Sequence, residues 1–226
     1  MRKPRLNSHD IFTIHDYNID VAHREIYLHS SLNSGEEEGG VDFRSATMFE
    51  KNLRYLNLIS DEPILVHMHL PGGEWQDCLG ICDAILACTC NIAILAYAKA
   101  ESSSSVLLQS ADLRILMPNT NVLIHYGFLS LDGEHSKAAV SSIKWSEEES
   151  DKMINIFTDR CMQSKIAKEK NWKKMIAKKH IVSQLANKGD WILNAQDAVN
   201  YGFADGVFGD KNFESIDAIK SYAKKI

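Results

Sequence analysis

The sequence predicts an α/β protein built on a mainly parallel sheet, and two observations carry this prediction. In the first half of the chain, short apolar runs alternate with segments whose apolar residues recur at helical spacing. Runs such as PILVHMHL (63–70) and NIAILAYA (91–98) are predominantly apolar, which is typical of strands buried on both faces of a parallel sheet. The helical segments between them supply the right-handed crossovers that parallel strands require.

The expected elements of the N-terminal half follow an N-terminal extension at residues 1–23. REIYLHS (24–30) alternates between apolar and polar residues as a strand does, and glycines around an acidic run at 34–40 indicate a loop. The elements after this loop are a helix at 41–60, the strand 63–70, a tight turn at 71–73, a helix at 75–88 and the strand 91–98.

The C-terminal half changes from short strands to mostly helical segments. A serine run opens a helix that ends near residue 111, and LRILM and NVLIHYG are two short strands on either side of Pro118. The later elements are a long, charged, mostly helical region at 136–180, a helix at 194–202 closed by Gly202, the end of the core at DGVFG, and a C-terminal helix within 211–226. The whole chain, 1–226, is expected to form a single domain.

The composition is typical of a globular protein. Hydrophobic residues make up 45% and charged residues 24% of the 226 residues, and the net charge of −5 gives no sign of a nucleic-acid-binding surface. No apolar stretch reaches the roughly 18 residues of a membrane helix, and no apolar run follows the basic N-terminus as in a secretion signal. The five cysteines, four of them within 78–90, are interpreted as reduced thiols. We therefore expect a soluble cytoplasmic protein with no nucleic-acid partner and no membrane partner.

A run of four serines, 102–105, lies between a buried strand and the apolar pair Leu107 and Leu108. A serine at the start of a helix can act as a nucleophile when a base lies within reach and backbone N–H groups can receive an oxyanion. The turn at 71–73, Pro-Gly-Gly, ends the preceding buried strand and is expected beside this serine run. His125 ends another strand and can supply the base. Composition alone does not select the orienting acid among the 30 carboxylates.

Four segments of the chain, taken in order, resemble the proteolytic subunit of the Clp (caseinolytic) protease family. They are the PGG turn, the serine helix with its leucine pair, MPNTNVLIHYG, and GDWILNAQDAVNYGFADGVFG. The family patterns that they resemble are SPGG, AASMGAFLLAAG, LPNSEVMIHQP and a late segment that contains S-A-x-E-A-x-x-Y-G. The resemblance covers about residues 24–210. It implies a crotonase-like fold of repeated β-β-α units with a mainly parallel sheet, in which 136–180 forms a projecting handle helix.

The resemblance also implies a serine-type endopeptidase with a catalytic triad. The family nucleophile corresponds to Ser102, five positions before Leu107, and the general base corresponds to His125 in LIHYG. The orienting acid corresponds to Asp190, four positions before Asn194. The spacing of 23 residues between serine and histidine is about two residues shorter than in the common bacterial form.

The same resemblance assigns the oxyanion hole to backbone N–H groups of Gly72 or Gly73 and of Ser103. Two residues of this region depart from the family pattern. Leu70 stands where the family has the serine that precedes its glycine turn, and Glu101 stands directly before the expected nucleophile. Ser103 and the two serines after it are interpreted as small residues that let the helix approach the sheet.

The partners implied by the resemblance are peptide or unfolded-protein substrates, further copies of the chain in heptameric or tetradecameric rings, and an AAA+ ATPase unfoldase. No cofactor and no metal are expected. The family segment that gates the axial pore is not recognisable in 1–23. A stripe on the charged helical region is expected to be exposed and to form an interface; its members are Ile143, Trp145, Met153, Ile156 and Phe157.

Two alternative functions remain open on the sequence alone. A Clp-like subunit can keep the fold as a catalytically inactive structural component, and a crotonase-superfamily enzyme can use the glycine turn to bind the thioester oxygen of an acyl-CoA. Three other features are given structural interpretations. His67 and His69 share one strand face without a third metal ligand at useful spacing, Cys88-Thr89-Cys90 contains buried thiols, and the lysine-rich stretch 165–180 is a solvated helical face.

Overall fold

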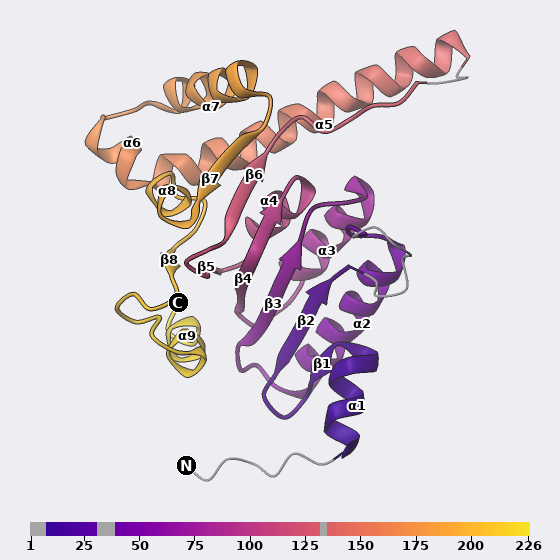
Figure 1. The fold of residues 1–226 in the computed structure, drawn as a ribbon, viewed down its shortest axis with the longest axis vertical. Coiled ribbons are helices and arrows are strands. Elements are labelled where there is room, and N and C mark those ends of the chain that lie inside the picture. Colours follow the sequence, from indigo (N-terminus) through magenta and orange to yellow (C-terminus); the bar gives the residue numbers. More distant parts are fainter. Residues whose placement is uncertain (1–7, 31–38, 132–134) are drawn as a thin grey trace.

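The computed structural model describes residues 8–30, 39–131 and 135–226, in which one mixed sheet carries helices on both faces (Figure 1). The strands are β1 Ile19–Asp20, β2 Glu25–His29, β3 Ile64–Leu70, β4 Ile92–Glu101, β5 Leu113–Leu116, β6 Asn121–Ile124, β7 Trp191–Asn194 and β8 Gly206–Val207. The helices are α1 Ser8–Tyr17, α2 Phe43–Ile59, α3 Trp75–Leu86, α4 Ser103–Leu108, α5 Ser136–Gln163, α6 Lys165–Glu169, α7 Lys174–Lys188, α8 Ala195–Asn200 and α9 Ile216–Ala223.

The sheet is mainly parallel, as the sequence predicts. Its main path runs β1-β2-β3-β4-β5-β8, and every neighbour on this path is parallel except the antiparallel pair β1–β2. Two further strands lie off this path, since β6 pairs in parallel with the end of β4 and β7 pairs antiparallel with β6.

Strand β4 changes its neighbour half-way along its length. Residues 93–96 pair with β5, whereas residues 99–101 pair with β6. Between the two stretches Ala98 has φ 52°, an uncommon value for a non-glycine residue that marks a local irregularity in the strand. The exchange brings the carboxyl ends of β3, β4 and β6 together at one corner of the sheet, with Leu70 opposite Ala100.

Each face of the sheet is closed by its own helices, which explains why β3 and β4 are apolar almost throughout. Ile64, Val66 and Met68 of β3 belong to the core under α2 and α3. Leu65 points to the opposite face, where it packs with Ile219 of α9 in a second core. The predicted burial of these strands on both faces is confirmed.

Helix α5 is packed only along its C-terminal half, and its N-terminal half projects from the body of the molecule (Figure 1). Ile143 and Trp145 are exposed on the projecting half, as expected. The expected exposure of Met153 and Phe157 is wrong, because both side chains are buried in the core of the same chain. Helix α7 contacts the packed part of α5 and covers it, together with α4.

Some boundaries and short elements differ from the sequence prediction. Strand β4 continues to Glu101, α4 ends at Leu108, and α1, β1 and β7 were not predicted. Of the loop expected at 34–40, residues 34–38 lie outside the described residues. Within the described ranges, no helix combines the length and the apolar character needed to cross a bilayer.

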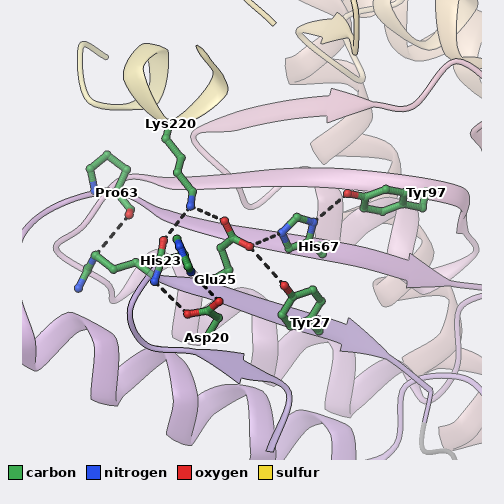
Figure 2. A network of polar contacts seen from close by, with 9 residues as sticks. Asp20, His23, Glu25, Tyr27, Pro63, His67, Tyr97 and Lys220 are labelled. Atoms are coloured by element: carbon green, nitrogen blue, oxygen red, sulfur yellow. Dashed lines mark hydrogen bonds and ion pairs between the residues drawn. The ribbon is translucent and has the colours of Figure 1, made fainter. Parts of the chain in front are cut away.

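A buried polar network joins α9 to the sheet (Figure 2). The carboxylate of Glu25 accepts a hydrogen bond from Lys220 of α9 and lies 3.0 Å from Nε2 of His67 on β3. Tyr97 Oη lies 2.9 Å from Nδ1 of the same histidine, and Tyr27 Oη donates to Glu25 over 3.3 Å. Burial alone would raise the pKa of Glu25, but the hydrogen bonds from His67 and Lys220 and the charge of Lys220 lower it to about 2. The network therefore contains a glutamate that stays ionised although it is only 8% exposed.

Candidate active site

Ser102 directly follows β4 and lies at the corner of the sheet with a strained backbone conformation. Ser102 is the residue between β4 and α4 and has φ 55° and ψ −129°, values that L-residues rarely adopt. Its N–H donates to the carbonyl of Leu123 in β6 over 2.8 Å, and its own carbonyl accepts from the N–H and the hydroxyl of Ser105. A sharp strand-to-helix turn of this kind makes the serine hydroxyl accessible, as in the nucleophile turns of α/β-hydrolases.

His125 reaches Ser102 because β6 and β4 are parallel neighbours and end at the same edge. His125 directly follows β6, and its Nε2 lies 2.7 Å from Ser102 Oγ. This is a hydrogen-bond distance between a hydroxyl and an imidazole nitrogen. The two residues therefore have the contact that a nucleophile and its base require.

Asp190 is brought to the other side of His125 by the pairing of β6 with β7. Ile124 opposes Trp191 in this antiparallel pair, so the residue after β6 lies next to the residue before β7. Asp190 Oδ1 is 3.3 Å from His125 Nδ1, and its side chain is 58% exposed. The structure thus brings Ser102, His125 and Asp190 together, with a longer contact and more solvent at the acid.

The three serines after Ser102 bind the start of α4 to its surroundings. All three are buried, in agreement with their interpretation as small residues at a close approach of helix and sheet. Their hydroxyls also donate hydrogen bonds, from Ser103 to the carbonyl of Gly73 over 3.2 Å and from Ser104 to that of Leu70 over 2.9 Å. Leu70, which departs from the family pattern, therefore contributes to the site through its backbone carbonyl, which holds the hydroxyl of Ser104.

The two glycines of the 71–73 turn are required by close contacts. Gly72 has φ 113°, and a Cβ on it would lie 2.6 Å from the Cβ of Ser102. Gly73 has φ 134°, and a Cβ there would lie 2.2 Å from the backbone nitrogen of Val41. No side chain fits at either distance, and both φ values favour glycine. The residues expected to provide oxyanion donors, Gly72, Gly73 and Ser103, therefore all lie around Ser102.

A cleft of about 570 Å³ opens in front of Ser102 and His125. Three segments line it, namely the glycine turn with the start of α3, the residues that follow His125, and one face of α5. The lining residues besides Ser102, Ser103 and His125 are Pro71, Gly73, Glu74, Trp75, Tyr126, Gly127, Phe128, Leu129, Trp145, Ser146, Glu149, Ser150 and Met153. A cleft of this size, with aromatic walls and a few polar groups, is typical of a ligand-binding site.

Sequence reasoning missed two features of this site. The first is β7, which holds Asp190 in place. Trp191 and Leu193 are buried and Ile192 is exposed, but all three residues are apolar, so this alternation is not visible in the sequence. The second is Glu149, whose carboxylate accepts from the indole N–H of Trp75 over 2.8 Å. This contact joins residues 74 positions apart, so no short sequence pattern predicts it.

The described residues contain no group of three or more histidine, cysteine or acidic side chains that could hold a metal ion. His67, which was given a structural interpretation above, lies between Glu25 and Tyr97. Of the residues in Cys88-Thr89-Cys90, Cys90 is buried and Cys88 is only partly buried.

A parallel sheet that brings a serine, a histidine and an aspartate from neighbouring strand ends to one cleft has the architecture used by serine hydrolases. Comparison with protein families gives a match of residues 37–211 to the Clp protease family. The match covers more than half of the chain, so the protein belongs to the Clp protease family, whose proteolytic subunits are serine peptidases.

Individual relatives agree with this membership at low identity. The chain is 25% identical over 171 residues to "ATP-dependent Clp protease proteolytic subunit 2" of Pseudomonas aeruginosa. This alignment covers 75% of this chain and 77% of the relative. It is 29% identical over 171 residues to "ATP-dependent Clp protease proteolytic subunit 3" of Nocardia farcinica, covering 74% and 71%. Among solved structures, a mutant of ClpP1 from Listeria monocytogenes matches with a TM-score of 0.63 at 17% identity, over 88% of this chain and 96% of that one. The Clp protease fold predicted from the sequence is therefore confirmed.

Proposed function

We propose that the protein is a cytoplasmic serine endopeptidase in which Ser102, His125 and Asp190 hydrolyse peptide bonds. The observation that carries the proposal is the 2.7 Å contact between Ser102 Oγ and His125 Nε2 at the mouth of the cleft. The strained backbone of Ser102 supports it, because such strain is maintained where it positions a reacting group.

The proposed reaction has two halves that use the same groups. Ser102 Oγ attacks the carbonyl carbon of the substrate while its proton passes to His125 Nε2. The oxyanion of the tetrahedral intermediate accepts hydrogen bonds from backbone N–H groups of Gly72 or Gly73 and of Ser103. The C–N bond then breaks, and His125 returns the proton to the leaving amine. Water, deprotonated by the same histidine, then attacks the carbonyl carbon of the acyl-enzyme. The bond from that carbon to Ser102 Oγ breaks, His125 returns the proton to Oγ, and the second peptide fragment leaves with a new carboxylate.

Asp190 has an orienting role in this proposal. A carboxylate at Nδ1 of His125 favours the tautomer that leaves Nε2 free to accept the serine proton, and it stabilises the imidazolium that forms. At 3.3 Å and with a side chain that is 58% exposed, the acid is screened by solvent, so its contribution is expected to be smaller than that of the histidine.

A fluorophosphonate probe tests the proposed nucleophile directly on the wild-type protein. The probe reacts covalently with activated serines, so peptide mapping is expected to find the adduct on Ser102 and none on the next three serines. The rate at which a fluorogenic peptide is cleaved is expected to fall in proportion to the fraction of protein that is labelled. An adduct on another serine would show that Ser102 is not the nucleophile. No adduct and no cleavage would favour an inactive structural subunit, and tight binding of coenzyme A in that case would favour an acyl-CoA enzyme.

We further propose that the chain assembles into rings that enclose the cleft and receive unfolded chains from an AAA+ ATPase. The support is the projecting half of α5, where Val140 and Ile143 are exposed although both are large and apolar. Isolated protomers rarely keep such side chains in water along one helix, whereas oligomer interfaces use them. Enclosure also explains how a peptidase can be tolerated among the other proteins of a cell.

Light scattering combined with size-exclusion chromatography tests the assembly. The expected mass is that of a heptamer or tetradecamer of the 25.4 kDa chain. Changing Val140 and Ile143 together to aspartate is expected to shift the mass to smaller species, because charges then occupy the proposed interface. Ser141→Asp places one such charge on a different face of the helix and is expected to keep the assembly. A monomer peak for the wild type over a wide range of concentration and salt would contradict the ring.

A further inference from the structure

The cleft in front of Ser102 contains two carboxylates, and His125 is the one residue of its described lining that can carry a positive charge. Glu74 and Glu149 line it, and none of the described residues that line it is a lysine or an arginine. Four of the other lining residues are aromatic: Trp75, Tyr126, Phe128 and Trp145. Aromatic faces attract cations and also pack against methylene groups. Carboxylates beside aromatic rings therefore form a surface suited to a long side chain with a positive end.

Glu149 lies on the face of α5 that is turned toward the cleft. The helix contributes Trp145, Glu149 and Met153 at intervals of four residues, which places their side chains on one face. Glu149 is 8% exposed, so its carboxylate is held mostly by protein groups. Burial alone would raise its pKa, but the hydrogen bonds from Lys152 and Trp75 and the charge of Lys152 lower it. The carboxylate is thus negative at neutral pH.

The two oxygens of Glu149 have partners of different character. Oε2 accepts from the indole N–H of Trp75 over 2.8 Å, a contact that fixes the carboxylate and the wall of the cleft together. Oε1 accepts from Lys152 Nζ over 2.6 Å, but the side chain of Lys152 is 63% exposed and does not line the cleft. An exposed ammonium of this kind exchanges readily with water or with another cation. A carboxylate also has about four lone-pair directions, of which these contacts use two.

We propose that Glu149 is a specificity-determining residue, which makes the cleft select a lysine or arginine side chain in the substrate residue whose carbonyl is attacked by Ser102. The apolar stem of that side chain packs between the aromatic walls, and its charged end reaches Glu149 in place of Lys152 or beside it. Glu74, which is exposed and also lines the cleft, adds a second negative charge that attracts a cationic side chain. This inference rests on the proposed peptidase function, because it names the substrates of the same site.

Two fluorogenic peptides that differ only at the residue before the scissile bond provide the test, one with lysine and one with norleucine. Norleucine keeps the apolar stem and lacks the ammonium, so the ratio of the two kcat/KM values isolates the charge. The wild type is expected to favour the lysine peptide by about tenfold or more, which is the usual effect of one hydrogen bond to a charged group. This preference is expected to weaken as salt is added.

Variants then assign the preference to a residue. Glu149→Gln keeps an acceptor for Trp75 and removes the charge, so the lysine-to-norleucine ratio is expected to fall about tenfold, mainly through KM of the lysine peptide. Lys152→Met removes the competing ammonium and is expected to raise the ratio several-fold. Glu148→Gln is the matched control, because this exposed neighbour carries the same charge but does not line the cleft; its ratio and its activity are expected to equal those of the wild type.

The outcomes separate this inference from the proposed function. Cleavage of both peptides with a ratio near one in the wild type would overturn the inference and leave the peptidase standing. Equal losses on both peptides in Glu149→Gln would assign Glu149 a purely structural role and would also overturn it. If neither peptide is cleaved, the peptidase proposal fails, and fluorescence anisotropy of the labelled peptides still measures selection. A lysine preference in binding that Glu149→Gln abolishes supports the inference, and equal binding rejects it.

Discussion

Replacing Ser102 by alanine is expected to abolish peptide hydrolysis, and replacing His125 by alanine is expected to lower kcat by roughly 10⁴-fold or more. The reason is that in the proposed mechanism the hydroxyl forms the new bond to the substrate, and the imidazole 2.7 Å away takes its proton. The measurement is kcat on the better of the two fluorogenic peptides, with circular dichroism and unfolding midpoints to verify that each variant is folded.

Combining the two substitutions provides a further check. If Ser102 and His125 act as one unit, the double variant is expected to be no slower than the slower single variant. Ser110→Ala is a suitable control, because this serine lies just beyond α4 and does not line the cleft, and its hydroxyl donates to the carbonyl of Leu107. Asp190→Asn is expected to retain more activity than His125→Ala, since its carboxylate is exposed and more distant. Full activity of Ser102→Ala would refute the assignment of the nucleophile.

Glu25→Gln is expected to have the largest effect on stability, lowering the free energy of unfolding at pH 7 by roughly 3 kcal/mol. The amide keeps the size of the side chain but removes the charge that faces Lys220 and His67 in a buried setting. Breaking one member of a buried ionic network leaves its partners uncompensated, and such losses typically amount to about 3–5 kcal/mol. Denaturant unfolding at a fixed protein concentration measures the effect.

The pH dependence of the free energy of unfolding tests whether Glu25 is the source of this stabilisation. Its pKa in the folded protein is lowered from 4.5 to about 2, so the folded state binds its proton less readily than the unfolded chain does. The stabilisation is therefore complete above about pH 4.5 and is lost as the pH falls toward 2. Glu25→Gln is expected to have a flatter stability profile in this interval.

Glu62→Gln is the matched control for this prediction. Glu62 also pairs with a lysine of the C-terminal segment, Lys224, but both side chains are more than half exposed. Exposed pairs contribute little, so a loss of no more than about 1 kcal/mol is expected. If Glu25→Gln and Glu62→Gln had equal effects, or if the acid slope of the wild type persisted in Glu25→Gln, the buried network would not be the cause.

The parts of the fold that the sequence predicts are those set by burial over several consecutive residues. β3 and β4 are recognisable because both of their faces are covered, which leaves an apolar run where a half-exposed strand would alternate. The turn at Gly72 is recognisable because two adjacent glycines mark a backbone that side chains cannot adopt. The meeting of Ser102 and His125 follows from two parallel neighbours that end at one edge.

Other features depend on contacts that no short segment encodes. An apolar helix face indicates that something covers it, but it does not distinguish the same chain from another copy. Met153 and Phe157 are covered within the protomer, whereas Ile143 is not. β7 has only four residues, and its strand character comes from pairing with β6. The interaction of Trp75 with Glu149 depends on how α5 crosses the molecule, which is a property of the complete fold.

The register between β6 and β7 has a consequence for the order in which a newly made chain acquires its parts. The serine and the histidine are separated by 23 residues and are fixed by strands that pair early in the sequence. The aspartate becomes available only when the ribosome has produced β7, after the whole of α5, α6 and α7. Contacts of long sequence separation also form late in folding, because closing a long loop costs entropy. An emerging chain therefore carries at most the serine and histidine, and the three groups come together only after β7 has been made and has paired with β6.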